Sequence, residues 1–183
     1  MKHLPPALAL ITLAAAAQAG QGLSYDSLSI GFNNFTNTEA AGHDRYYWIS
    51  ASARLPNSNF VLGASTTLGG GGNTGSIGHQ LNGVDSVNIS YVFDDVAHFA
   101  DVVIQAGSNE NRSAYVRKNL GNGFEATAGY FRFSSTDDGY FVGLGYSFSK
   151  ALSLDYFYQR DSNGWPSSSA TWVLNSIAVR YNF

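Results

Sequence analysis

Hydrophobic and polar residues alternate along most of the chain after residue 19, with a period of two residues. This period is typical of β-strands, in which successive side chains point to opposite faces of a sheet. No part of this region keeps the 3.6-residue period of an amphipathic helix. The alternation predicts strands at residues 23–35, 44–55, 60–68, 81–93, 99–108, 113–120, 124–134, 139–149, 152–160 and 171–183.

The connections between these segments alternate in length. Those after even-numbered strands are tight, as at residues 121–123 and 150–151. Those after odd-numbered strands include the three longest, at residues 36–43, 69–80 and 161–170. Short turns at one end and long loops at the other are how outer-membrane barrels are organised. We therefore expect an all-β fold, an antiparallel up-and-down transmembrane β-barrel of ten strands. Eight strands are the alternative if two shorter segments merge or do not pair.

Residues 1–19 differ from the rest of the chain and predict a signal peptide. Lys2 supplies a positive charge, residues 4–17 form an apolar run, and Ala17-Gln18-Ala19 has the small-x-small pattern that signal peptidase cleaves. The apolar run is shorter than the roughly 20 residues that a membrane-spanning helix needs. We expect cleavage after Ala19 and a single barrel domain at residues 20–183.

Large aromatic residues gather at both ends of the apolar face, as in the aromatic girdles of membrane proteins. One group is expected near one rim: Phe60, Phe124, Phe148, Tyr181 and Phe183. The other is expected near the opposite rim: Tyr47, Tyr130, Tyr140 and Tyr158. We therefore expect the apolar face to meet lipid and the polar face to line the lumen. Inward rings such as Trp48 and Phe157 are expected to be accommodated by inward glycines such as Gly31 and Gly143.

Composition narrows the function. Only 13% of the 183 residues are charged and 14% are aromatic, which excludes a disordered chain. The chain has no cysteine, so disulfides, thiolate metal sites and a cysteine nucleophile are excluded. The net charge of −3 gives no basic excess, and we expect no nucleic-acid partner. His79 and His98 fall in connections at opposite ends, and we expect neither a metal site nor a cofactor.

Charged residues on the inward face fall near the predicted periplasmic end of the lumen. They are Arg54, Arg117, Arg180, Asp101, Glu125 and Asp155. Unpaired charges are costly in a narrow, poorly hydrated lumen, and arginine binds carboxylates through two parallel hydrogen bonds. We expect these residues to form a layer of ion pairs that plugs the barrel. The alternative is an open channel in which the same charges select ions.

A second set of basic residues, Arg45, Arg132 and Arg160, is predicted to point outward at the extracellular strand ends. The guanidinium group matches phosphate geometry, so these arginines are candidates for contact with lipopolysaccharide. Ordinary solvated rim charge is the alternative interpretation. Trp165 in the 161–170 loop is the candidate contact residue for an external ligand, unless it folds back over the barrel mouth.

The chain ends in Ile177-Ala178-Val179-Arg180-Tyr181-Asn182-Phe183. This ending, with Val179, Tyr181 and Phe183 on one face, resembles the C-terminal assembly signal of bacterial outer-membrane proteins. Gly22-Leu23-Ser24-Tyr25 and Leu55-Pro56-Asn57 also resemble the small ten-stranded outer-membrane barrels of proteobacteria, some of which are named for regulation by a diffusible signal. The resemblance implies insertion by the barrel-assembly machinery, a bacterial outer-membrane location with exposed loops, and no catalytic motif.

The sequence therefore predicts a plugged outer-membrane barrel with a structural or adhesive role. Its partners would be outer-membrane lipid and lipopolysaccharide, together with a host or cell-surface ligand. One alternative is a narrow pore for small solutes or ions. A second is a hydrolase at the extracellular rim, using His43-Asp44, Asp137-Asp138 or Asp161. We expect no enzymatic activity, because a catalytic base needs a positioned partner and the long loops of a substrate cleft are missing.

Overall fold

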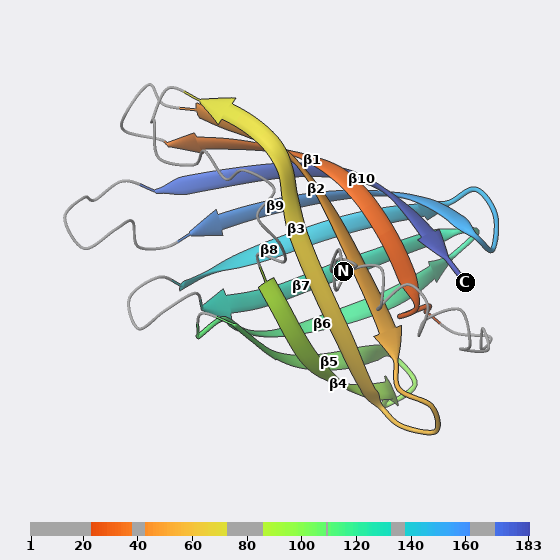
Figure 1. Cartoon of the computed structure of the whole chain (residues 1–183). Helices are drawn as coiled ribbons and strands as arrows, with labels where there is room; N and C mark the ends of the chain where they lie inside the picture. Colours follow the sequence, from red (N-terminus) through yellow and green to blue (C-terminus); the bar gives the residue numbers. More distant parts are fainter. Residues whose placement is uncertain (1–22, 38–42, 73–85, 109, 133–137, 162–170) are drawn as a thin grey trace, which may run out of the picture.

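The computed structural model describes residues 23–37, 43–72, 86–108, 110–132, 138–161 and 171–183. Ten antiparallel strands form a closed barrel in which chain neighbours are sheet neighbours and β1 pairs with β10 (Figure 1). The strands are β1 Ser27–Asn37, β2 His43–Arg54, β3 Phe60–Gly72, β4 Ser86–Val96, β5 Ala100–Gly107, β6 Arg112–Gly121, β7 Phe124–Arg132, β8 Asp138–Ser147, β9 Leu152–Asp161 and β10 Trp172–Asn182.

The ten-stranded antiparallel barrel predicted from the sequence is confirmed, and the eight-stranded alternative is wrong. Closure follows from the pairing of β1 with β10 along their whole length. The β3–β4 pairing is shorter and covers Phe60–Ser65 of β3. Several predicted strand ends are wrong, and β4, predicted to end at residue 93, continues to Val96. Two others differ by four residues. The first strand begins at Ser27 and not at residue 23, and β3 continues to Gly72, through glycines that we expected in a loop.

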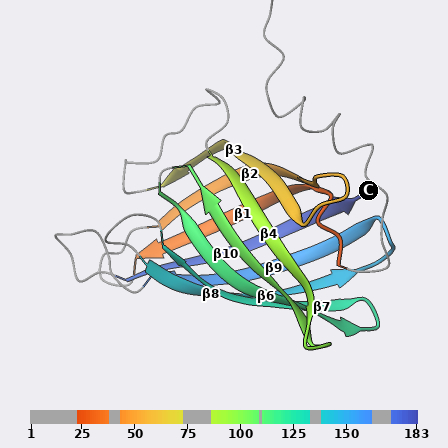
Figure 2. The same ribbon diagram turned by 90° about the horizontal axis from the view of Figure 1, so that it is seen from below.

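The two ends of the barrel differ in their connections. We call the end with the connections 55–59, 97–99, 122–123 and 148–151 the turn end, and the opposite end the loop end. The C-terminal residue also lies at the turn end (Figures 1 and 2). The β6–β7 turn is tight because Gly121, Asn122 and Gly123 all have positive φ, a conformation that glycine and asparagine adopt most readily.

The outer surface of the barrel is apolar. On β8, for example, Val142 and Leu144 point outward and are 47% and 59% exposed, whereas the alternating Gly143 and Gly145 are buried. Both predicted aromatic groups include exposed rings, such as Phe148 at the turn end and Tyr130 toward the loop end. Among the described residues there is no helix long and apolar enough to cross a membrane.

The inner surface is polar and tightly fitted. Hydroxyl groups pair across neighbouring strands, as in the Ser65–Ser86 contact at 2.9 Å. The indole N–H of Trp48 donates to Asn33 Oδ1 at 2.8 Å, and its ring lies over Gly31 on the neighbouring strand. A Cβ atom added at Gly31 would come within 2.5 Å of that ring, so the predicted accommodation of an inward ring by a glycine is confirmed here.

Candidate functional site in the barrel lumen

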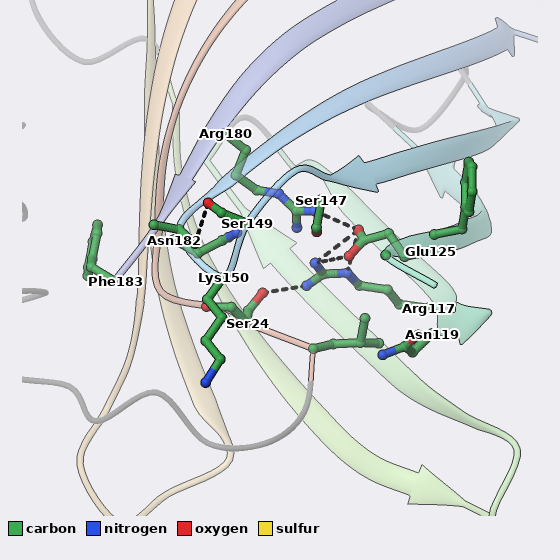
Figure 3. A pocket seen from close by; sticks show the side chains of 14 residues that line it. Ser24, Arg117, Asn119, Glu125, Ser147, Ser149, Lys150, Arg180, Asn182 and Phe183 are labelled. Atoms are coloured by element: carbon green, nitrogen blue, oxygen red, sulfur yellow. Dashed lines mark hydrogen bonds and ion pairs between the residues drawn. The ribbon is translucent and has the colours of Figure 1, made fainter. Parts of the chain in front are cut away.

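Four charged side chains form a continuous set of ion pairs across the turn end of the lumen. We call Arg117 of β6, Glu125 of β7, Asp155 of β9 and Arg180 of β10 the ion-pair chain. Arg117 Nη2 lies 2.9 Å from Glu125 Oε2, and Arg180 Nη2 lies 2.9 Å from Glu125 Oε1. Arg180 also contacts Asp155, with Nε 3.0 Å from Oδ2. Glu125 thus joins the two arginines, and Figure 3 shows its carboxylate between them.

The ion-pair chain spans five consecutive strands because β8, in its middle, contributes a glycine. Gly145 is the register partner of both Glu125 and Asp155. A Cβ atom at Gly145 would lie 2.7 Å from Asp155 Oδ1 and 2.7 Å from Glu125 Cγ. The missing side chain therefore leaves the space in which the two carboxylates approach the arginines.

The charges of the ion-pair chain are well shielded from solvent. Side-chain exposure is 13% or less for all four residues. Two cations and two anions make the chain electrically neutral, which offsets much of the cost of burying them. Arg117 gains a further partner outside the strands, because its Nη1 donates to the Ser24 carbonyl oxygen at 2.6 Å. The segment before β1 is thereby attached to the ion-pair chain.

Tyr25, in that same segment, fills the neighbouring part of the lumen. Its ring belongs to a buried cluster with Val61, Val92 and Val103, from β3, β4 and β5. Its hydroxyl group donates to Asp101 Oδ2 at 2.9 Å. The Arg117 guanidinium carbon lies 5.0 Å from the ring centroid, a cation–π distance. Burial raises the pKa of the Tyr25 phenol, so the hydroxyl group stays protonated and able to donate.

Of the six inward charges expected in one layer, the structure brings together Arg117, Glu125, Asp155 and Arg180. Arg54 and Asp101 do not join these ion pairs. Arg54 instead pairs with Asp94 at 2.7 Å in a more exposed position, 29% and 45% for the two side chains. Asp101 accepts hydrogen bonds from Tyr25 and from the Asp95 backbone N–H. The physical reason is that Tyr25, which is not among the inward rings expected from the sequence, occupies the space beside these two residues.

Cavities lie on both sides of the ion-pair chain. A cavity of about 560 Å³ on the turn side is lined by Ser24, Lys150 and Asn182 together with Arg117 and Arg180 (Figure 3). Two further cavities, of about 510 and 480 Å³, extend toward the loop end. These are lined mainly by neutral polar and aromatic side chains, among them Asn33, Trp48, Ser50, Gln105 and Tyr115. Arg117 and Arg180 border all three cavities, so the ion-pair chain forms the partition between the two sides.

The three outward arginines expected to act together do not form one group. Arg132 on β7 and Arg160 on β9 are exposed and two strands apart. Arg45 on β2 lies elsewhere around the barrel, and its Nε donates to Asn34 Oδ1 at 3.3 Å. Sequence reasoning missed Arg112, the register partner of Arg132. Its position at the boundary between a turn and a strand gave no periodic signal for its direction.

The C-terminal residues lie where the alternation places them. Val179 and Tyr181 point outward and are 44% and 51% exposed. Phe183 is half-buried, with its ring 6.1 Å from that of Tyr181 and its backbone N–H bonded to the Asp26 carbonyl oxygen at 3.3 Å. Their role as an assembly signal stays a prediction.

The structure describes only some of the rim residues that were candidates for hydrolysis. Asp161 is buried and accepts a hydrogen bond from Gln159, and Asp138 accepts one from Tyr130. Trp165, Asp137 and the predicted signal peptide 1–19 lie outside the described residues. Within the described ranges no group of three or more histidine, cysteine or acidic residues is placed to hold a metal ion.

Comparisons with known proteins support the fold. No family model matches the chain, and no curated protein matches it. The S-type phycobiliprotein lyase CPES of Guillardia theta is similar with a TM-score of 0.51 and 7% identity, over 85% of this chain and 86% of that one. At this identity the likeness concerns the barrel fold alone.

Small outer-membrane β-barrels are also among the similar structures. Neisserial surface protein A has a TM-score of 0.45 at 11% identity, over 86% of this chain and 95% of that one. The KdgM porin, solved in complex with disordered oligogalacturonate, has a TM-score of 0.43 at 16% identity, over 85% and 99% of the two chains. The strand pairing by itself establishes that the chain is a closed antiparallel barrel of ten strands.

Proposed function

We propose that this protein is a barrel of the bacterial outer membrane that is closed at its periplasmic end and has a structural or surface-interaction role. The apolar outer face supports the membrane location. Side chains such as Ile30, Leu144 and Ile177 are more than half exposed on the barrel exterior, an arrangement suited to lipid and unfavourable in water. Short turns belong on the periplasmic side of such barrels, which makes the turn end periplasmic.

The observation that carries the closed lumen is the ion-pair chain beside Tyr25. The valines packed around Tyr25 come from β3, β4 and β5, and the ion-pair chain comes from β6, β7, β9 and β10. The segment before β1 adds a further contact through Ser24. Ions crossing here would have to separate buried charge pairs or displace a packed ring, and both cost several kcal/mol. A barrel closed in this way presents its loop end as the surface available to outside partners.

Conductance tests the closed lumen directly. Purified protein is inserted into planar bilayers, and its folding is verified by the mobility shift between unheated and boiled samples in detergent electrophoresis. We expect a shifted band and no discrete conductance steps. Stable steps from a protein that shows the shift would overturn the closed lumen and leave the barrel assignment intact. A missing shift, or a processed protein that stays monodisperse without detergent, would overturn the membrane location.

A narrow pore is the second candidate, and the cavities on both sides of the ion-pair chain favour it. Cavities of about 560 and 480 Å³ are separated by one layer of side chains, so a rearrangement of that layer would join them. Adding Glu125→Gln to the same recordings separates the two candidates. Conductance in this variant alone would support the plug, whereas equal conductance in both proteins would support the pore.

A further inference from the structure

Two arginines face each other on the outside of the barrel at its loop end. Arg112 is the first residue of β6 and Arg132 the last residue of β7, and the two are register partners with exposed side chains. The Cβ atoms of such partners lie about 5 Å apart, and like charges placed directly opposite each other destabilise a sheet. Asp138, the register partner of Arg132 on β8, supplies one carboxylate beside this pair. A further anion that binds both guanidinium groups would reduce the repulsion between them.

Arg160 adds a third positive charge nearby. Arg132 is the register partner of Asp138 on β8, and Arg160 of β9 is the register partner of Tyr140, two residues further along β8. Neighbouring strands are about 4.8 Å apart and residues rise about 3.4 Å along a strand, which puts the Arg132 and Arg160 backbones about 12 Å apart. Among the described residues of this patch, Asp138 and the exposed Glu110 supply two negative charges against three positive ones, a net positive charge.

The patch borders a pair of outward tyrosines. Tyr130 and Tyr140 are register partners, 49% and 46% exposed, and Tyr130 precedes Arg132 by two residues on the same face. Tyrosine rings gather at the level where a bilayer changes from hydrocarbon to headgroups. Side chains immediately beyond them reach the headgroups, and guanidinium groups bind phosphate through two parallel hydrogen bonds.

We propose that Arg112 and Arg132, with Arg160 beside them, form a binding site for the phosphate groups of a phosphorylated glycolipid in the outer leaflet. The proposal rests on the outer-membrane location proposed above. It excludes Arg45 from the site, because its register partners Asn34 and Gly71 bring no second cation to the same place. Arg45 therefore serves as a matched control, an outward arginine near the same end of the barrel without an opposed one.

The test measures binding of phosphorylated lipid A to the detergent-solubilised barrel by native mass spectrometry. The proteins are the wild type, the double variant Arg112→Gln/Arg132→Gln and the control Arg45→Gln. Because the double variant loses the charge-assisted hydrogen bonds of two guanidinium groups, we expect it to bind at least about tenfold more weakly. The control should stay within about twofold of the wild type, as expected for an isolated exposed charge.

Two further binding measurements identify the ligand. Lipid A without its phosphates should bind the wild type as weakly as intact lipid A binds the double variant, and inorganic phosphate should not displace intact lipid A at equal concentration. Unchanged binding in the double variant would overturn the site, and displacement by inorganic phosphate at equal concentration would overturn the lipid as its ligand. The electrophoretic mobility shift is recorded for every variant, so a failure of the barrel assignment is seen separately from a failure of lipid binding.

Discussion

On the β3–β5 side of the barrel the turn end of the lumen is filled by valines and the ring of Tyr25, whereas on the β6–β10 side it is filled by the ion-pair chain. In the apolar half, the ring that packs against the valines belongs to Tyr25, which precedes the first strand. The ionic half is built from strand residues alone, and Arg117 touches both halves through its contact with the Tyr25 ring.

Because the two halves are held by different interactions, a substitution should affect their stability in different ways. An apolar cluster loses packing in proportion to the atoms removed. An ion-pair chain responds more abruptly, because removal of one charge leaves a buried opposite charge without compensation. Glu125 is the most sensitive member, since it is the anion that contacts both arginines.

Glu125→Gln should have the largest effect. The variant keeps the shape of the side chain and removes the charge that two buried guanidinium groups share. Breaking a buried ion pair costs about 3–5 kcal/mol, and we expect a loss of this size in the free energy of unfolding. Urea unfolding in detergent micelles, followed by the electrophoretic mobility shift, measures it.

Asp94→Asn is the matched control for that prediction. It also removes a carboxylate from an arginine pair at the turn end, but the Arg54–Asp94 pair is partly exposed. Exposed pairs contribute at most about 1 kcal/mol, so the control should change little. Equal losses in the two variants would contradict the distinction between the buried chain and the more exposed pair.

Gly145→Ala should have an intermediate effect. The added methyl group would lie 2.7 Å from both the Asp155 Oδ1 atom and the Glu125 Cγ atom, and it would force these side chains apart. Overpacking of a tightly fitted interior costs about 1–3 kcal/mol. The same urea titration measures the loss, and Val142→Ala on the outward face of β8 is the control. An unchanged unfolding midpoint in Gly145→Ala would show that the ion-pair chain does not need the glycine.

The strand pattern predicted much of this arrangement and missed one part for a physical reason. Alternation with a period of two gives the side-chain direction of Arg117, Glu125, Asp155 and Arg180, because all four lie within regular strands. Tyr25 falls within the predicted strand 23–35 but lies before β1 in the structure, so strand pairing gave no register for its contacts with β3, β4 and β5. The sequence therefore predicted charges in the lumen without the ring that separates Arg54 and Asp101 from the others.

Tyr25→Phe should have the smallest effect and tests the apolar half. The variant keeps the ring among the valines and removes the hydrogen bond to Asp101. Because Asp101 keeps the hydrogen bond from the Asp95 backbone N–H, we expect a loss of about 1 kcal/mol. The raised pKa of Tyr25 adds a pH dependence. The folded protein keeps the phenol proton, whereas the unfolded chain loses it above a pH of about 10. The contribution of this phenol to stability is therefore present below that pH and declines above it, and Tyr25→Phe should lack this part of the decline. Unfolding free energies of both proteins between neutral and strongly alkaline pH measure the difference, and parallel declines would show that the Tyr25 phenol ionises as freely as an exposed one.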